Sequence, residues 1–376
     1  MMAFGDRLKL ARKKAGMTMR ELAEQTGISA TAVSKFERSV ITPRQSTVLR
    51  LAKALGVRPA FFFKEITVKT LTPAYRKHSG LREKETEAIE ATVVEKLERY
   101  LEVEELFPER AREKLPQFTV TNICDVENVA SVLRKEWNLG IGPLDSLCGR
   151  LEDRSIIVIA IEGPAKFDGY SCWANGSRPT IVYNSLLPGD RQRFTLGHEL
   201  GHLVIRTKND LLDEQAIANR FSAAFLVPKE AAFAELGSKR KNLNFNELRL
   251  LKREYGLSIQ AWIRRAFDLG IIEETTYRNL FRRLSTMGWR RSEPEEIKRE
   301  YPQRFELLIH QALAEELITP NRAKILMEPE GKIELLQPSK EDLQQTALLV
   351  AEVYEDDPEL TAFSEADFGE INDEDL

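Results

Sequence analysis

Cysteine and histidine are scarce in this chain of 376 residues, which contains three of the first and four of the second. Three cysteines cannot form a closed disulfide framework, and Cys124, Cys148 and Cys172 lack the C-x-x-C spacing of a metal site. No apolar run reaches the length that a transmembrane helix needs, and the first residues lack the hydrophobic stretch of a signal peptide. We therefore expect a cytoplasmic protein rather than a secreted, disulfide-stapled or membrane-spanning one.

The net charge of −4 conceals a strong asymmetry along the chain. Residues 1–65 carry 13 Lys and Arg against five Asp and Glu, whereas residues 355–376 contain ten acidic residues and no basic one. A basic region in an otherwise acidic chain indicates a polyanionic partner for that region alone. We expect 351–376 to be a disordered acidic tail, with binding of the tail to the basic region, as a DNA mimic, as an alternative.

Short helices separated by turn residues are predicted over residues 4–63. Thr18 and Glu21 have the spacing of a capping box, Gly27 ends that helix, and Ser29 can cap the next one. Two short helices joined by a glycine-containing turn, inside a basic domain, form the helix-turn-helix layout.

The sequence from residue 17 to residue 57 resembles the XRE family of Cro/repressor-type DNA-binding domains. The matching stretches are MTMRELA at 17–23, GIS at 27–29, VSKFER at 33–38 and LAKALGV at 51–57. The resemblance implies that 1–65 binds double-stranded DNA, with 29–37 as a recognition helix in the major groove. The DNA-contact residues that we predict are Arg20, Ser29, Ala30, Thr31, Ser34, Lys35 and Arg38. Such domains usually read two half-sites, which favours a homodimer; the alternative is a helical module that contacts protein instead.

After residue 65 the sequence divides by composition and hydrophobic pattern into four predicted parts, of which the last is the acidic tail at 351–376. Residues 66–118 read as a linker and an amphipathic connector helix, and 119–235 as a domain with a small sheet. In that domain an apolar strand at 156–161 and a hairpin of 170–174 with 180–183 precede a helix from about 191 to 205. Residues 236–350 are predicted to be helical without evident chemistry. The predicted fold class is thus multidomain α+β, with an all-α N-terminal part, a centre with a small β-sheet and helices, and an α-helical C-terminal region. The centre is expected to be zincin-like because one of its helices carries the H-E-x-x-H motif at 198–202.

Two of the four histidines occur together in His198-Glu199-Leu200-Gly201-His202, which matches H-E-x-x-H. Helical residues i and i+4 share a face, so both imidazoles can bind one zinc ion, and Glu199 can act as the general base. Zinc lowers the pKa of its bound water to about 7 and polarises a scissile carbonyl. The alternative is that the two histidines only line a buried helix face. The remaining histidines, His78 and His310, are interpreted as a linker residue and a packed or surface residue.

The wider sequence around the motif resembles the ImmA/IrrE family of zinc metallopeptidases. The matching stretches are RQRFTLGHELGHL at 191–203 and ANRFSAAFLVP at 218–228. Members of this family cut or help to remove repressor proteins, and some relatives are proposed to be antitoxin-like autoregulators. The family's third metal ligand, a Glu, aligns with Gln215. We predict the adjacent Glu214 as the third ligand, with Gln215 as the residue that the register favours.

Two functions follow from these resemblances. The first is a DNA-binding transcriptional regulator whose zinc-dependent endopeptidase domain cleaves a protein, such as a repressor, with residues 178–184 as the sheet edge that pairs with the substrate. The second is a non-catalytic autoregulator, an antitoxin or phage-type repressor, whose degenerate peptidase fold binds a partner protein such as a toxin. Gln215 in place of a glutamate favours the second.

Overall fold

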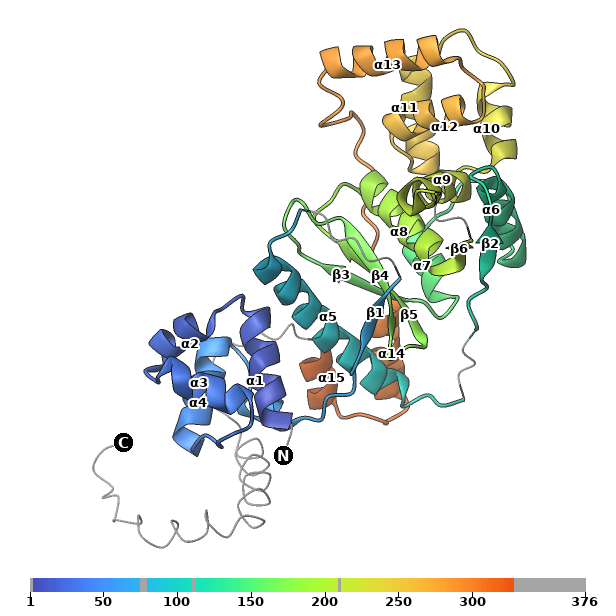
Figure 1. The fold of residues 1–376 in the computed structure, drawn as a ribbon. Coiled ribbons are helices and arrows are strands. Elements are labelled where there is room, and N and C mark those ends of the chain that lie inside the picture. The colour runs from blue at the N-terminus through green and yellow to red at the C-terminus, as the bar shows by residue number, and fades with distance from the viewer. Residues whose placement is uncertain (1–2, 75–79, 110–112, 209–210, 328–376) are drawn as a thin grey trace, which may run out of the picture. The chain divides into compact units, whose positions relative to one another are not determined.

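The computed structural model describes residues 3–74, 80–109, 113–208 and 211–327 (Figure 1). The described residues divide into two compact units, of which the first contains those up to Thr67 together with 325–327, and the second contains those of Val68–Lys324. The predicted acidic tail and His78 lie outside the described residues. None of the helices in the described ranges is long and apolar enough to cross a membrane.

The first unit is the predicted bundle of short helices. It contains α1 (Ala3–Lys14), α2 (Met19–Thr26), α3 (Ala30–Glu37), α4 (Gln45–Leu55) and the 3₁₀ helix η1 (Pro59–Phe63). The capping box of Thr18 and Glu21 is confirmed, and Gly27 ends α2 with φ of +66°, a conformation that glycine adopts without strain. Ser29 accepts a hydrogen bond from the Ala32 N–H and so begins α3. The turn chemistry of this domain is therefore local and readable from the sequence.

A mixed sheet forms the centre of the second unit. Its strands are β1 (Leu71–Pro73), β3 (Ile157–Ile161), β4 (Gly169–Ala174) and β5 (Arg178–Asn184), in the spatial order β1-β4-β5-β3. The strand β5 is parallel to β3 and antiparallel to β4, and β1 is antiparallel to β4. A second, parallel pair joins β2 (Phe118–Val120) to β6 (Ile205–Thr207). The predicted hairpin is confirmed, and its turn places Asn175 and Gly176 at positive φ.

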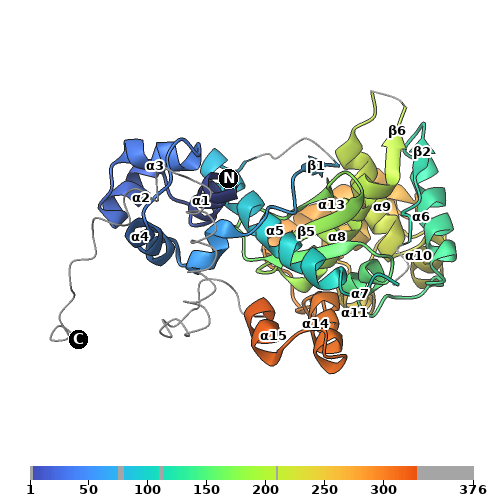
Figure 2. The ribbon, with the colours of Figure 1, turned by 90° about the horizontal axis from the view of Figure 1, so that it is seen from below.

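Helices cover both faces of this sheet. The motif helix α8 (Gly189–Val204) packs on β4 and β5 and is itself packed against α9 (Glu214–Leu226), while α5 (Glu83–Glu104) lies on the other side (Figures 1 and 2). The sequence suggested that α5 is a connector. Instead, Lys96 of α5 donates to the Ala160 carbonyl of β3 at 2.8 Å, and the apolar stripe of α5 is buried. The helices α6 (Asp125–Glu136) and α7 (Leu147–Glu152) complete this region.

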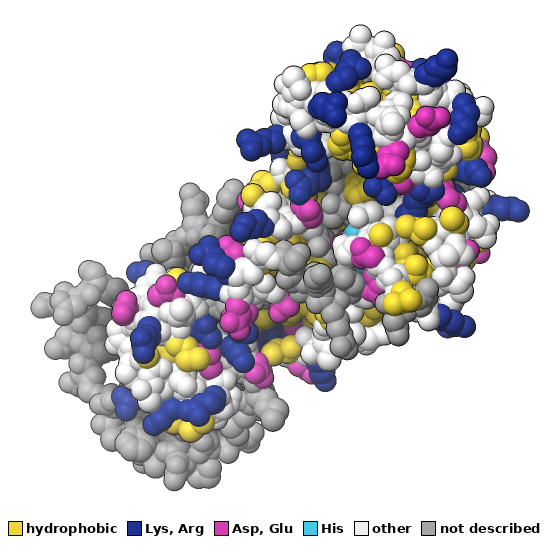
Figure 3. Space-filling view, turned by 45° about the horizontal axis from the view of Figure 1, so that its top comes forward, with side chains coloured by type: hydrophobic (Ala, Val, Ile, Leu, Met, Phe, Trp, Pro, Cys, Tyr) yellow, Lys and Arg dark blue, Asp and Glu magenta, His cyan; other side chains and the backbone are white. Residues whose placement is uncertain are grey.

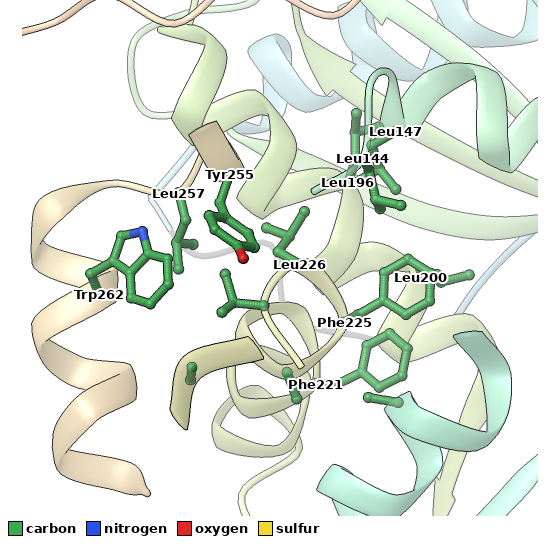
Figure 4. Close-up of a cluster of buried hydrophobic side chains, with 14 of the residues drawn as sticks. Leu144, Leu147, Leu196, Leu200, Phe221, Phe225, Leu226, Tyr255, Leu257 and Trp262 are labelled. Atoms are coloured by element: carbon green, nitrogen blue, oxygen red, sulfur yellow. The ribbon is translucent and has the colours of Figure 1, made fainter. Parts of the chain in front are cut away.

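A helical lobe follows the motif region. It contains α10 (Lys229–Leu236), α11 (Phe245–Tyr255), α12 (Ile259–Asp268) and α13 (Glu274–Thr286), and the chain then continues to α14 (Arg304–Ala314) and α15 (Pro320–Met327). The ring of Phe305 in α14 stacks on Tyr100 of α5, with centroids 6.0 Å apart. One continuous core runs from α8 through α9 to α11 and α12, as Figure 4 shows from Leu196 and Phe225 to Trp262. The lobe is therefore packed directly behind the helix that carries the histidines.

Candidate metal centre and DNA-binding surface

Helix α8 carries the two motif histidines on one face, as the spacing predicted. The Nε2 atoms of His198 and His202 lie 3.1 Å apart, and the ring centroids lie 4.7 Å apart. Side chains four residues apart in a helix lie one above the other, so both imidazoles point to the same spot. The two nitrogens thus converge on a common site.

Two glycines of α8 allow α9 to approach this face closely. A Cβ atom added to Gly197 would lie 2.6 Å from Ser222 Oγ, and one added to Gly201 would lie 3.3 Å from Ala218 Cα. The absence of side chains at these two positions lets the backbones come together. The first turn of α9 is thereby brought beside the histidine pair.

The third side chain at the site is Gln215, from that first turn. Its Nε2 atom lies 3.1 Å from His202 Nε2, and it also hydrogen-bonds His198. Glu214, which we predicted as the third ligand, is exposed instead. One residue turns the side chain by about 100° around a helix axis, so neighbours in α9 cannot both face α8. Within the described part of the chain, no three His, Cys, Asp or Glu side chains are grouped to hold a metal ion.

Asn219, one turn further along α9, orients the first histidine. Its Oδ1 lies 2.9 Å from His198 Nδ1 and accepts a hydrogen bond from the Nδ1–H, so that the Nε2 atom keeps its lone pair and faces His202. Burial lowers the pKa of His198, and burial together with His198 and Arg206 lowers the pKa of His202 to about 3. Both imidazoles are therefore neutral at pH 7, which is the form that binds a metal. Asn219 belongs to the stretch at 218–228 that resembles the ImmA/IrrE family, but the sequence did not indicate its contact with His198.

Glu199 lies on the sheet side of α8. Its side chain is 7% exposed, and Ser171 of β4 donates a hydrogen bond from its Oγ to Glu199 Oε2 at 2.8 Å. Burial raises the pKa of Glu199 to about 7, against the opposing effect of the Ser171 hydrogen bonds. Such a carboxyl group is well matched to accept and return a proton near neutral pH. No sequence signal marked Ser171, because its contact depends on how the sheet packs on α8.

The donor set can be compared with what a divalent metal requires. Two nitrogens that bond one tetrahedral zinc ion at 2.0–2.1 Å stand about 3.3 Å apart, close to the 3.1 Å between the two Nε2 atoms. The amide of Gln215 can turn its oxygen, an acceptable ligand, toward the same point. The residues therefore fit a metal ion, with a neutral third ligand where a carboxylate would bind more strongly.

A groove of about 1250 Å³ begins at this cluster and runs along the helical lobe. Gln215 and Asn219 line its end near the histidines. Its lining includes Phe194 of α8, close to the histidines, together with aromatic and exposed basic side chains of α13 and the segment after it: Tyr277, Phe281, Trp289, Arg290, Arg291, Lys298 and Arg299. In Figure 3, Lys and Arg side chains gather over the part formed by α10 to α13, and a small area of histidine surface lies in the hollow beneath it. The site is thus open to a ligand much larger than a water molecule.

The sheet edge that we predicted for substrate pairing is wrong. Residues 178–184 form β5, which is hydrogen-bonded to β4 on one side and to β3 on the other. An interior strand has no free backbone groups for another chain. The edges of the four-stranded sheet are β1 and β3.

The predicted DNA-contact residues lie on and around α3 in the first unit. Thr31 and Lys35 are exposed on this helix, and Ala30 and Ser34 are half-buried. Arg20 on α2, Ser29 and Arg38 are exposed at helix ends. On the inner face, Arg12 forms a bidentate ion pair with Glu37, with Nη2 2.9 Å from Oε2, which fixes α3 against α1. The unit therefore presents an exposed helix with basic residues on a rigid support.

The fold and the two sites define a DNA-binding helix-turn-helix domain joined to a peptidase-type domain with a zincin-like motif. Residues 8–62 match the family described as Helix-turn-helix, and residues 152–267 match the family described as IrrE N-terminal-like domain. The chain therefore combines an XRE-type helix-turn-helix domain with a domain of the ImmA/IrrE-like peptidase family. The predicted fold class and both resemblances are confirmed.

One relative is similar to a short part of the chain. The HTH-type transcriptional regulator ImmR of Bacillus subtilis (strain 168) is 41% identical over 56 residues. That match covers 15% of this chain and 44% of the relative, so less than half of the relative's length is spanned.

Proposed function

We propose that this protein is a cytoplasmic transcriptional regulator that binds double-stranded DNA through residues 1–65 and cleaves a regulatory protein with its ImmA/IrrE-type domain. The observation that carries the catalytic part is the convergence of His198 and His202, with Glu199 buried beside them on the same helix. The similarity to a transcriptional regulator supports the first part. A homodimer would let two such domains read two half-sites.

Each residue of the candidate metal centre would have its own role. His198, His202 and the Gln215 amide oxygen would hold a zinc ion, and Asn219 would keep the His198 Nε2 lone pair directed to it. When bound, zinc would lower the pKa of a coordinated water to about 7 and polarise the scissile carbonyl. Glu199 would accept a proton from the attacking water at its carboxylate and return it to the leaving amine, and Ser171 would hold that carboxylate in place.

The neutral third ligand sets the strength of metal binding in this proposal. A glutamine oxygen carries no charge, so the bound zinc ion gains less Coulomb energy than it would from a carboxylate. We expect the Gln215→Glu variant to bind zinc at least about tenfold more tightly than the wild type, which is the size of change in affinity that substitutions near a metal commonly produce. Gln215→Ala and His202→Ala should lose most of the metal, and Glu214→Ala should match the wild type.

Zinc stoichiometry of the five purified proteins, measured after dialysis against a weak chelator, tests the ligand set. Retention of zinc by Gln215→Ala together with its loss from Glu214→Ala would assign the third position to Glu214. Equal and negligible zinc in the wild type and in Gln215→Glu would remove the metal centre from the proposal.

Proteolysis is tested separately with Glu199→Gln. We expect the zinc-loaded wild type to cut a proteome-derived peptide library, read by mass spectrometry, and the Glu199→Gln variant to bind zinc equally but not to cut. Cleavage by the variant at the wild-type rate would show that Glu199 is not the base.

The contact between Gln215 and the histidines favours a second candidate function. A peptidase fold with a weakened metal centre can serve as a binding module, so the protein could be an autoregulator of the antitoxin or phage-repressor type that holds a partner such as a toxin. Absence of cleavage by both the wild type and the zinc-binding Gln215→Glu variant would favour this function over proteolysis.

A further inference from the structure

The edge of the peptidase sheet next to β4 is occupied by the chain's own linker. The strand β1 pairs antiparallel with β4, with Leu71, Thr72 and Pro73 opposite Ala174, Trp173 and Cys172. Backbone hydrogen bonds flank this pairing on both sides: the Asn175 N–H donates to the Thr70 carbonyl and the Ala74 N–H to the Ser171 carbonyl, each at 2.9 Å. The side chain of Asn175 also accepts from the Lys69 N–H at 2.9 Å.

This linker strand ends beside the proposed general base. Ser171 accepts the Ala74 N–H with its carbonyl, and its hydroxyl donates to Glu199 Oε2 at 2.8 Å. One residue of β4 therefore contacts both the linker and the carboxylate. Ala74 itself is half-buried and packs against the core that contains α8.

Without β1, the strand β4 would be the edge of the sheet, because β5 and β3 follow it on the other side. A free edge binds an extended peptide through main-chain hydrogen bonds, and such a peptide on β4 would run past Ser171 toward Glu199. The linker already has the extended conformation, the antiparallel direction and the hydrogen bonds of that peptide.

The hold of the linker on β4 is slight. The strand has three residues, and Lys69, Thr70, Thr72 and Pro73 are exposed. Short edge segments with few buried contacts open at low free-energy cost compared with the core. Pro73 stands at a non-hydrogen-bonded position of the ladder, between the backbone hydrogen bonds that Thr70 and Ala74 make to β4. Its nitrogen therefore faces away from β4, and because proline has no N–H it offers no donor to a further strand.

We propose that residues 69–74 are a tethered occupant of the substrate-binding edge of β4, and that an extended segment of the protein substrate replaces them there before cleavage. The proposal rests on the proteolytic function stated above. The first unit ends at Thr67, so the helix-turn-helix domain is connected to β1 through only three residues. Release of the linker would therefore be tied to the part of the chain that binds DNA.

A reversible lock can be built from a cysteine that the chain already has. Cys172 is a free, buried cysteine opposite Pro73. Non-hydrogen-bonded partners have Cα atoms about 4.5 Å apart, within the range of about 4.4–6.8 Å that a disulfide spans. The exposed Cys124 is removed by Cys124→Ser in all proteins of the series. Of the two cysteines that remain, Cys172 lies opposite Pro73, whereas Cys148 is buried in the core beside Tyr183.

The test is cleavage of the proteome-derived peptide library by full-length, zinc-loaded Pro73→Cys, oxidised with diamide or reduced. We expect the oxidised form to cut at least about tenfold more slowly than the reduced form, because the linker can no longer leave β4. We expect reduction of the disulfide to restore the rate. Pro73→Ser, treated identically, controls for the loss of proline and for the redox conditions. Equal rates of the oxidised and reduced forms, with the disulfide verified by mass spectrometry, would overturn the inference while the proteolytic function stands.

A second variant acts in the opposite direction. Ala74→Pro removes the N–H that Ser171 accepts, and we expect it to cut about two- to fivefold faster than the wild type at low peptide concentration, because more of β4 is free. A rate at or below that of the wild type, with zinc content unchanged, would count against the inference. If neither the reduced Pro73→Cys protein nor the wild type cuts any peptide, the proteolytic function fails, and this inference fails with it.

Discussion

The two domains place their functional side chains in opposite environments. In the helix-turn-helix domain, Thr31, Lys35 and Arg38 are exposed on a helix whose inner face holds the fold together. In the peptidase-type domain, Glu199 and His202 are each 7% exposed and are part of the packing itself. The first domain can therefore change its contacts without changing its stability, whereas in the second domain function and packing depend on the same residues.

A turn of the same chemistry occurs in both regions and leads to different outcomes. Gly27-Ile28-Ser29 joins α2 to α3, and Gly256-Leu257-Ser258 joins α11 to α12, with φ of +66° at both glycines and a serine that caps the next helix. Yet α3 presents an exposed face, while Trp262 and Ile263 of α12 are fully buried and Arg264 is its exposed residue. A helix-turn-helix geometry by itself therefore does not make a DNA-binding helix; the burial of its second helix decides.

The largest expected effect concerns a buried charge cluster in the peptidase-type domain. Glu127 of α6 hydrogen-bonds Arg220 of α9 at 2.6 Å and Arg265 of α12, with Oε2 2.6 Å from Arg265 Nη2, and the Arg265 side chain is fully buried. Glu127→Gln should lower the free energy of unfolding by about 3–5 kcal/mol, because it leaves a buried guanidinium without its countercharge. Chemical denaturation of the full chain measures this. Glu274→Gln, which breaks an exposed pair with Arg278, is the control and should cost less than about 1 kcal/mol.

The cluster of Glu127, Arg220 and Arg265 also predicts that the stability of the protein depends on pH. Burial raises the pKa of Glu127, but Arg265 and Arg220 outweigh it, so the pKa lies below its ordinary value of 4.5. A carboxyl whose pKa is lowered by folding stabilises the protein above its unfolded pKa and loses that contribution as the pH falls through its folded pKa. The wild type and Glu127→Gln should therefore differ most at neutral pH and converge below pH 4.5. A difference that stays constant down to pH 3 would show that the effect is packing rather than charge.

The second prediction uses the two turns directly. An alanine at a φ of +66° costs about 1–2 kcal/mol at either glycine. At Gly256 a Cβ would also lie 2.5 Å from Arg193 Nε, and Arg193 is held by Glu300 at 2.6 Å, whereas at Gly27 the nearest atom is 3.8 Å away. Gly256→Ala should therefore destabilise its domain by about 1–3 kcal/mol more than backbone strain alone.

Gly270→Ala is the matched control in the same domain, because its φ is also +66° and nothing lies within 4 Å of the added Cβ. Denaturation curves that follow both domains measure all three variants. Equal losses for Gly256→Ala and Gly270→Ala would show that Arg193 accommodates the methyl group.

The smallest expected effect concerns DNA contacts of the exposed helix. Lys35→Ala and Arg38→Ala should each lower the slope of log K against log salt by about one on a mixed-sequence duplex, because each removes one phosphate contact. The melting temperature should stay unchanged, since both side chains are exposed. Lys298→Ala, an exposed lysine of the other domain, serves as control. A loss of slope by the control, equal to that of Lys35→Ala, would move the DNA-binding surface away from α3.

Much of the fold was readable from short-range patterns. The capping box at Thr18, the hairpin turn at Asn175 and the shared face of His198 and His202 each depend on residues within a few positions of one another. The packing of α5 on β3 and the interior position of residues 178–184 in the sheet were not readable, because they depend on which elements pack side by side. The same limit applies to Ser171, whose link to Glu199 spans 28 residues.

The sequence alone determined that two histidines share a helix face, that a glutamate stands beside them, and that a basic helix-turn-helix domain comes first. The helical repeat and turn chemistry are properties of the local backbone, so these features needed no further information. Only the tertiary structure decided that Gln215 rather than Glu214 meets the histidines, that α12 is buried, and that the linker pairs with β4. Each of these depends on how one element is rotated and packed against another, and that is settled by the burial of the whole core.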